Sequence, residues 1–343
     1  MKATEGLNPD GSSLPAQATP DRSQSDAFLA EVGVVHVPSR QRHEELPPFL
    51  LYRSQGLGLY LLPGERFRPY ADAVGILREL TYRQQLSGSG QSRDLDSRDP
   101  HYDHFLLVDE ASGELAGSAR LQFVPGAIDG SVPADLPEGQ HSYLEHVYPG
   151  IKADLARRGN HLEIGRVALA PRFQRQPHTL MCLFRGGLQV AVSSGYSSIH
   201  GLVSYNHFAH ADGVNQHFLS SLLRPPFLDV ASDCPQPRHP FDQIQASHQP
   251  GEVESIQMLE QQIREQLEPT FRLPVLLRQY INLMEARVRN LSLARDFNQI
   301  TEILMAADLR RIPSTRLAHF IDFAHEPVYR SFSWFRGEAD IRR

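Results

Sequence analysis

An apolar strand pattern that a proline interrupts constrains the fold of this chain most. In "HLEIGRVALAPRFQR", residues 161–175, the residues Ile164, Val167 and Leu169 favour a β-strand. Pro171 ends this strand because proline has no N–H to donate to a sheet ladder. Residues 178–195 then carry apolar side chains at helical spacing, and residues 196–205 return to a strand pattern. The first strand therefore ends at a polar rim, rich in Arg and Gln, that leads into a helix.

A second pattern predicts a β-hairpin. "HFLLVDEASGELAGSARLQFV", residues 104–124, holds two apolar runs joined by a turn of Asp, Ser and Gly. Helical spacing recurs in residues 71–85 and again in residues 255–268, where Pro269 ends the pattern. Antiparallel strands, one strand–loop–helix step and further helices together predict an α+β fold.

Composition excludes several classes of protein. The 343 residues are 41% hydrophobic, which is enough for a sizeable core, and the net charge of −6 argues against a nucleic-acid-binding module. The two cysteines, Cys182 and Cys234, form no C-x-x-C motif, so neither a disulfide scaffold nor a zinc ribbon is indicated. No apolar run approaches the roughly 18 to 20 residues of a membrane span, and the N-terminus lacks the apolar core of a signal peptide. We expect a cytoplasmic protein, with any membrane association limited to peripheral contact with the inner membrane.

Several short motifs occur in an order that is found in a known family. These motifs are "LRELTYRQQ", "RDLDSRDPHYDHFLLVD", "GELAGSARL", "YLEHVY", "LEIGRVALAPRFQR", "LFRGG" and "IHGLVSY". In this order they resemble the acyltransferase branch of the GNAT superfamily and, more narrowly, the hemolysin-like ornithine-acyl-carrier-protein N-acyltransferases, which make lyso-ornithine lipid. The segment "LPVLLRQYINLMEARVRNLSLARDFNQITEILMAADLRRIP" is similar to the C-terminal part of that family. Acyl-homoserine-lactone synthases and N-acyl amino acid synthases share the N-terminal part of the pattern.

The resemblance implies a fold and an activity. The fold is a GNAT-like mixed, mostly antiparallel sheet flanked by helices, with a helical C-terminal extension. The activity is transfer of a long-chain fatty acyl group from acyl carrier protein to the amine of an amino acid such as ornithine. Two alternatives remain open: a signal synthase of the N-acyl amino acid or acyl-homoserine-lactone type, and a non-catalytic GNAT-like binding module. Acyl carrier protein and an amino acid are thus the implied partners, without a metal or a cofactor other than acyl-ACP or acyl-CoA as the donor.

Polarity divides the chain into three parts. Residues 1–45 are rich in Gly, Pro, Ser, Asp and Gln, which predicts a disordered lead-in because such a segment buries too little apolar area to offset its ordering entropy. Residues 46–230 are predicted to form the acyltransferase core. Residues 231–343 are predicted to be a mainly helical C-terminal extension of the same catalytic unit.

Candidate site residues follow from the chemistry that the resemblance implies. An amine that attacks a thioester must lose a proton, and the developing oxyanion needs a hydrogen-bond donor. The resemblance places this donor on the backbone N–H groups of a splayed strand, near residues 167–169. Glu163 and Glu145 are the acids nearest this region and are candidates for taking the proton or holding the ammonium, with Arg166 beside them as a clamp for a carboxylate. The further candidates for binding the acceptor are Arg78, Arg120 and Ser204.

The expected donor-binding loop departs from the family pattern. CoA-binding members carry a glycine-rich loop whose backbone N–H groups hold a pyrophosphate at a helix N-terminus. Here the position reads "QRQPHTL", residues 174–180, with a proline and no glycine, which favours acyl carrier protein as the donor. The carrier is acidic, so we expect it to dock on the cationic residues around the strand-to-helix turn, which are Arg172, Arg175 and Arg185.

Three features also have simpler interpretations. Glu163 and Arg166 could form an ordinary surface ion pair, which contributes roughly 0 to 1 kcal/mol. The acids of residues 94–103 lack the Gly and the distal Glu of a calcium loop, and turns and helix caps explain them better. The histidines of residues 207–217 have no carboxylate at ligand spacing, which favours solvated loop histidines over a metal site.

Overall fold

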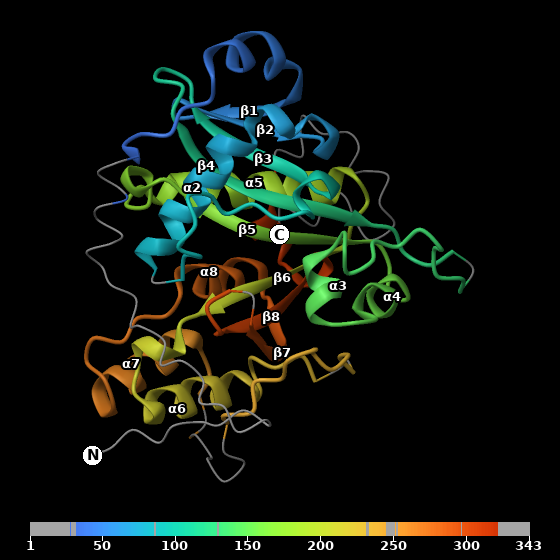
Figure 1. Ribbon diagram of the computed structural model, residues 1–343. Coiled ribbons are helices and arrows are strands. Elements are labelled where there is room, and N and C mark those ends of the chain that lie inside the picture. The colour runs from blue at the N-terminus through green and yellow to red at the C-terminus, as the bar shows by residue number, and fades with distance from the viewer. Residues whose placement is uncertain are drawn as a thin grey trace, which may run out of the picture.

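The computed structural model describes residues 28, 32–85, 87–128, 130–230, 233–244, 251, 253–295 and 297–321. In this part of the chain, eight strands form one sheet in the order β1-β2-β3-β4-β5-β6-β8-β7 (Figure 1). The strands are β1 (Leu50–Ser54), β2 (Leu57–Leu62), β3 (Asp103–Asp109), β4 (Leu115–Val124), β5 (His161–Leu169), β6 (Ser198–Tyr205), β7 (Arg287–Ala294) and β8 (Ile300–Asp308). All neighbouring pairs are antiparallel except β5 and β6, which are parallel. The predicted mixed, mostly antiparallel sheet is confirmed.

Two helices, α2 (Ala71–Gln84) and α5 (Pro177–Ser193), cover opposite faces of the β1–β5 part of the sheet (Figure 1). The neighbours His104 and Phe105 on β3 point to opposite faces, as successive strand residues do. His104 contacts Arg78 of α2, whereas Phe105 lies against Gly186 of α5. A Cβ atom at Gly186 would meet Leu59 of β2 at 2.2 Å, so only glycine allows α5 to lie this close to the sheet.

The C-terminal part of the chain is less helical than the sequence predicts. Its helices α7 (Ile256–Gln266) and α8 (Val275–Met284) are confirmed, and α9 (Ser314–Leu317) is a single short turn. However, β7 and β8 form a hairpin that extends the main sheet beyond β6. Buried on both faces, β8 has an almost continuous apolar sequence, which by itself does not distinguish a strand from a helix.

The remaining helices are α3 (Tyr143–Val147) and α4 (Ile151–Ala156), which precede β5, and α6 (Asp212–Leu222), which follows β6. No helix among the described residues is both long enough and apolar enough to span a membrane.

Part of the predicted lead-in belongs to the fold. Val35 and Val37 are buried in the core, and backbone hydrogen bonds join Val35 to Leu115 and Val37 to Gly113. Residues 33–37 thus lie along the start of β4, which corrects the disorder predicted for this stretch. Their apolar side chains bury enough area to offset the cost of ordering. Residues 1–27 of the predicted lead-in lie outside the described residues.

The parallel pair β5 and β6 separates after three residues. Residues 161–163 of β5 pair with residues 198–200 of β6, and beyond this point the two strands have no pairing with each other. β5 continues along β4 to Leu169, while β6 continues along β8 to Tyr205. The sheet is therefore split into a V at its centre.

Candidate functional site

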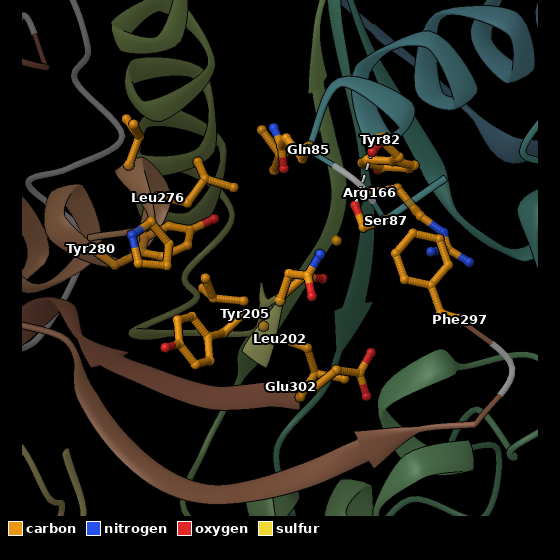
Figure 2. Close-up of a pocket in the computed structure, with 18 of the residues that line it drawn as sticks. Tyr82, Gln85, Ser87, Arg166, Leu202, Tyr205, Leu276, Tyr280, Phe297 and Glu302 are labelled. Carbon is orange, nitrogen blue, oxygen red and sulfur yellow. Dashed lines mark hydrogen bonds between the residues drawn. The ribbon is translucent and has the colours of Figure 1, made fainter. Parts of the chain in front are cut away.

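A cavity of about 420 Å³ lies where β5 and β6 separate. Its size is within the usual range for small-molecule sites, roughly 300 to 1,000 Å³. Figure 2 shows Tyr82, Arg166 and Phe297 on one side of it and the α8 residues Leu276 and Tyr280 on the other. The cavity therefore has a polar, arginine-containing side and an apolar side.

A second, smaller cavity of about 20 Å³ adjoins the apolar side. The two cavities share Ile164, Val167 and Tyr280. Its remaining walls are apolar side chains of β3, β4, β6, α5 and α8, among them Leu183 and Met284. The apolar side of the main cavity thus continues toward the core between β5 and α5.

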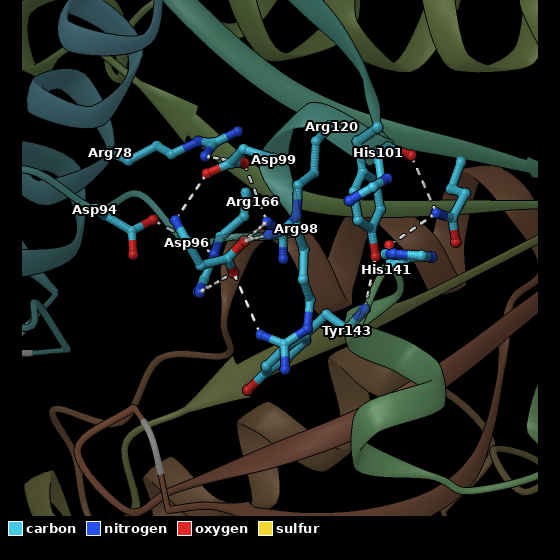
Figure 3. A network of polar contacts seen from close by, with 12 residues as sticks. Arg78, Asp94, Asp96, Arg98, Asp99, His101, Arg120, His141, Tyr143 and Arg166 are labelled. Atoms are coloured by element: carbon cyan, nitrogen blue, oxygen red, sulfur yellow. Dashed lines mark hydrogen bonds and ion pairs between the residues drawn. The ribbon is translucent and has the colours of Figure 1, made fainter. Parts of the chain in front are cut away.

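Two fully buried arginines hold two aspartates beside the cavity (Figure 3). Arg78 donates to Asp99 at 2.8 Å, and Arg120 donates to Asp99 at 3.1 Å and to Asp96 at 3.0 Å. Burial alone would raise the pKa of Asp99, but the two guanidinium groups outweigh it and hold the pKa well below its ordinary value. Arg120 lines the cavity, whereas Arg78 lies behind it on α2. Arg78 therefore acts on the site through Asp99.

Arg166 occupies a bulge in β5 and faces the cavity. Between the pairs Ser118–Ala168 and Arg120–Gly165, β5 has one residue more than β4, and Arg166 has a left-handed φ of 52°. Strained backbone of this kind is common beside functional sites. The guanidinium forms ion pairs with Asp94 at 3.4 Å and Asp96 at 3.7 Å. The bulge thus aims a cation at the point where the strands part.

Two aromatic rings cover the Arg166 guanidinium. Its Cζ atom lies 5.4 Å from the ring centroid of Tyr143 and 5.0 Å from that of Phe297. Cation–π contacts of this kind fix the orientation of the guanidinium without neutralising it. Arg166 is therefore held rigidly on the polar side of the cavity.

Glu163 lies just before the split and is held by four hydrogen bonds. It accepts from the hydroxyl of Tyr102 at 2.6 Å, from Ser142 at 2.8 Å, from the backbone N–H of Leu144 at 3.1 Å and from the ammonium of Lys152. Burial raises its pKa, yet Lys152 and the other donors outweigh burial and lower it. This geometry ties α3 and α4 to β5 and makes the carboxylate a weak base. The catalytic role of Glu163 stays a prediction.

Glu145 and Ser204, which the sequence also predicts for the site, lie in different places. Glu145 accepts from the backbone N–H groups of Gly150 and Lys152, at 2.6 and 2.9 Å, and so ties α3 to the start of α4. Among the described residues that line the cavity, Glu145 is not found. Ser204 of β6 is exposed and does line the cavity, beside its β8 partner Glu302.

Backbone groups of β5 also face the split. A Cβ atom on Gly201 of β6 would meet the carbonyl oxygen of Ile164 at 2.4 Å, so this carbonyl lies close to β6. Residues 164–167 line the cavity, which is slightly earlier than the predicted donor position at 167–169. Their polar groups on this side have no β6 strand to pair with.

The three arginines predicted to bind a carrier lie outside this cavity in the described part of the chain. Arg172 forms ion pairs with Glu114 at 2.6 Å and Asp109 at 3.8 Å. Arg175 is exposed in the turn before α5, and Arg185 of α5 stacks over the ring of Tyr52 at 4.7 Å. The carboxylates offset the charge of Arg172, which leaves Arg175 as the more accessible cation.

The two loops with simpler interpretations differ from each other: the acids form ion pairs, whereas the prediction of solvated histidines is wrong for His207, which is buried, and His210 lines the cavity. The acids of residues 94–99 hold the arginines of the network. His210 contacts Glu268 at 2.9 Å, and His207 contacts Thr301 at 2.9 Å. No group of three or more potential ligand side chains is placed to bind a metal ion in this part of the chain.

Among the cavity residues that sequence reasoning missed are Tyr143, Tyr280, Phe297 and Glu302. The first three are ordinary apolar or aromatic positions in their local patterns. Glu302 carried a usable signal, because it is a single acid within the apolar run "ITEILMAA" of β8. Buried carboxylates are rare, and one at the centre of a sheet calls for a partner or a ligand.

The mixed sheet, split between β5 and β6 and flanked by helices, is a GNAT-like fold. Residues 77–184 match the family model described as an acetyltransferase (GNAT) domain. This match supports an acyltransferase of GNAT type, and it ends within α5, before β6, β7 and β8. No curated protein matches the chain.

Solved structures with low sequence identity are also similar to this chain. One is FeeM, an N-acyl amino acid synthase from uncultured soil microbes, with a TM-score of 0.38, 13% identity, and coverage of 77% of this chain and 98% of that one. Another is TofI in a ternary complex with an inhibitor and MTA, with a TM-score of 0.34, 12% identity, and coverage of 76% and 96%. A third is the loading GNATL domain of CurA from Lyngbya majuscula, with a TM-score of 0.33, 14% identity, and coverage of 74% and 98%.

Proposed function

We propose that this protein is an N-acyltransferase that moves a fatty acyl group from a carrier-bound thioester to the amine of an amino acid such as ornithine. The observation that carries the proposal is the split between β5 and β6, because the cavity at this split is lined by Arg166, by backbone of β5 that does not pair with β6, and by an apolar wall. Each of these three features has a different role in acyl transfer. The cation binds the carboxylate of the acceptor, the backbone N–H groups bind the oxyanion, and the apolar wall receives the acyl chain.

The thioester carbonyl is placed against residues 164–167. The backbone N–H groups of this stretch stabilise the oxyanion that develops when the amine attacks. The acyl chain extends past Ile164 and Val167 toward α5 and Tyr280, along the apolar side and the adjoining cavity. The acceptor then occupies the polar side, with its carboxylate at Arg166.

Acyl carrier protein is the proposed donor. The turn before α5 has no glycine, and α5 begins at Pro177, which has no N–H to donate, so this turn offers less of the backbone cradle that a CoA pyrophosphate needs. A carrier protein brings its own docking surface and depends less on this loop. The exposed Arg175 supplies positive charge beside the predicted entry of the thioester.

The test is an acyl-transfer assay with separated donors. Palmitoyl-ACP and palmitoyl-CoA are each incubated with the protein and with a panel of amino acids that includes ornithine. Release of free thiol is followed, and the products are identified by mass spectrometry. We expect an N-acyl amino acid and a higher kcat/KM for palmitoyl-ACP. If thiol release never exceeds the rate without protein, the chain is a binding module and the proposal fails.

A further inference from the structure

We propose that Glu302 of β8 binds the ammonium group of the acceptor and takes its proton. This inference rests on the proposed function and adds to it the residue that activates the amine. Glu302 is 3% exposed and lines the main cavity, at the end of the split away from the apolar wall (Figure 2). It lies outside residues 77–184, so the matched GNAT segment does not contain it.

Two hydroxyl groups from different elements hold the Glu302 carboxylate, and a third lies on its neighbouring strand. Tyr143 of α3 donates to its Oε1 atom at 2.9 Å, and Ser292 of β7 donates to its Oε2 atom at 3.4 Å. Ser204 is its direct partner on β6 and also lines the cavity. Hydroxyls orient a carboxylate and can accept a hydrogen bond from an ammonium group at the same time. The site is therefore built to hold a small cation beside an anionic oxygen.

Tyr143 connects Glu302 with Arg166. Its hydroxyl donates to Glu302, while its ring contacts the Arg166 guanidinium at 5.4 Å. One tyrosine side chain thus lies between the Glu302 carboxylate and the Arg166 guanidinium, which also pairs with Asp94 and Asp96. An α-amino acid carries an ammonium group and a carboxylate close together. In the proposed arrangement, its ammonium lies at Glu302 and its carboxylate at Arg166.

Glu163 is less suited to this task than Glu302. The ammonium of Lys152 already pairs with Glu163, and the hydrogen bonds from Tyr102 and Ser142 hold its two oxygens on the α3 and α4 side of the strand. A second ammonium group at Glu163 would have to displace Lys152. The Tyr143 and Ser292 hydroxyls that donate to Glu302 can rotate and accept from an incoming ammonium group.

The proposed step is balanced as follows. Glu302 takes one proton from the ammonium, and the free amine attacks the thioester carbon, so a C–N bond forms. When the tetrahedral intermediate collapses, the C–S bond breaks and the second proton of the nitrogen passes to the departing thiolate. The amide keeps the third hydrogen, and Glu302 releases its proton to solvent. The products are an N-acyl amino acid, a free thiol and one proton.

The first arm of the experiment measures binding without a donor. Calorimetry compares the wild-type protein, Glu302→Gln and the control Glu110→Gln with the twenty standard amino acids, ornithine and the des-amino analogue of the best binder. Glu110 also accepts a tyrosine hydroxyl, from Tyr60, but lies outside the residues that line the cavity. We expect Glu302→Gln to weaken amino-acid binding at least tenfold and to leave the des-amino analogue unaffected. Equal binding of the amino acid by all three proteins, or no binding by the wild type, overturns the inference.

The second arm measures transfer to a nucleophile that needs no deprotonation. Hydroxylamine is uncharged at pH 8, so its attack on palmitoyl-pantetheine does not require Glu302. We expect Glu302→Gln to lose roughly 10²- to 10⁴-fold in transfer to the amino acid and to keep transfer to hydroxylamine. Loss of both reactions would make Glu302 a structural residue and overturn the inference. A wild-type protein that releases thiol with neither nucleophile instead refutes the proposed function, while the binding arm still decides whether Glu302 holds the ammonium.

Discussion

The carboxylate of Glu163 and the ammonium of Lys152 form an ion pair whose side chains are only 5% and 1% exposed. The pair joins α4 to β5 directly below the split of the sheet. Replacing Lys152 by Met leaves the carboxylate buried without its cation. We expect Lys152→Met to lower the free energy of unfolding by about 3 to 5 kcal/mol, measured by urea denaturation.

The double variant Lys152→Met/Glu163→Gln is the control for this prediction. It removes both charges, so it should be more stable than Lys152→Met alone. If the double variant loses the sum of the two single losses, the two side chains do not interact and the prediction is wrong.

Two buried histidines predict a loss of stability in mild acid. Burial, with a smaller contribution from Arg78 at His104 and from Lys152 at His161, lowers the pKa of each imidazole to about 3, against 6.5 for an exposed histidine. Each binds a proton more weakly in the folded state, so the stability present above pH 6.5 is lost as the pH falls toward 3. The expected slope is about 1.4 kcal/mol per pH unit for each histidine.

The variant His161→Leu tests this slope. Urea unfolding is measured between pH 4 and pH 6.5 for both proteins. The slope of the free energy of unfolding against pH should be smaller in the variant, by about the contribution of one histidine. An unchanged slope would mean that His161 is protonated in the folded protein. Below this pH range, Asp99 also contributes to the pH dependence. Its pKa is lowered in the folded protein, so the stability that it contributes is lost as the pH falls below about 4.

Arg166→Lys tests the proposed contact with the acceptor carboxylate. Lysine keeps the charge but loses the planar guanidinium that makes two parallel hydrogen bonds and stacks between Tyr143 and Phe297. We expect KM for the amino acid to rise about tenfold or more with a smaller change in kcat, measured by thiol release. Arg185→Lys, outside the cavity, is the matched control. A fall in kcat alone would place Arg166 at the reacting carbonyl instead.

Charge reversal at Arg175 tests carrier docking. Because acyl carrier proteins are acidic, Arg175→Glu should raise KM for acyl-ACP, and the effect should shrink at high salt. The rate with acyl-pantetheine should stay the same, because this donor has no protein surface. Arg264→Glu, an exposed change on α7, controls for net charge. Equal losses with both donors would contradict a docking role.

Gly187 of α5 tests the path of the acyl chain. It lines the smaller cavity, and a Cβ atom there would lie 3.2 Å from the Cδ1 atom of Ile164. Gly187→Val should fill this space and lower kcat/KM for palmitoyl donors about tenfold relative to octanoyl donors. A parallel loss for both donors would show that the chain takes another route, and circular dichroism checks that α5 still folds.

Local sequence patterns were sufficient for most elements. The hairpin of β3 and β4, the strand β5 with its end at Pro171, and the helices α5 and α7 all follow from periodicity and from proline chemistry. Periodicity alone does not identify the strand β8, because a strand buried on both faces lacks the alternation of apolar and polar residues. Arg78 of α2 is fully buried, because Asp99 from a distant loop compensates its charge.

The sequence by itself determined the order of strands and helices, the polar rim after β5 and the residue types that acyl transfer requires. Only the tertiary structure decided which of these residues meet. Glu163 and Arg166 are three positions apart on one strand and both line the cavity, but Arg166 lies at a bulge, whereas Glu163 is paired with Lys152 and hydrogen-bonded to Tyr102. Glu302 reaches the same cavity from a strand more than 130 residues further along the chain, where it hydrogen-bonds to Tyr143. Such contacts depend on strand pairing and on burial between distant segments, and neither leaves a local trace in the sequence.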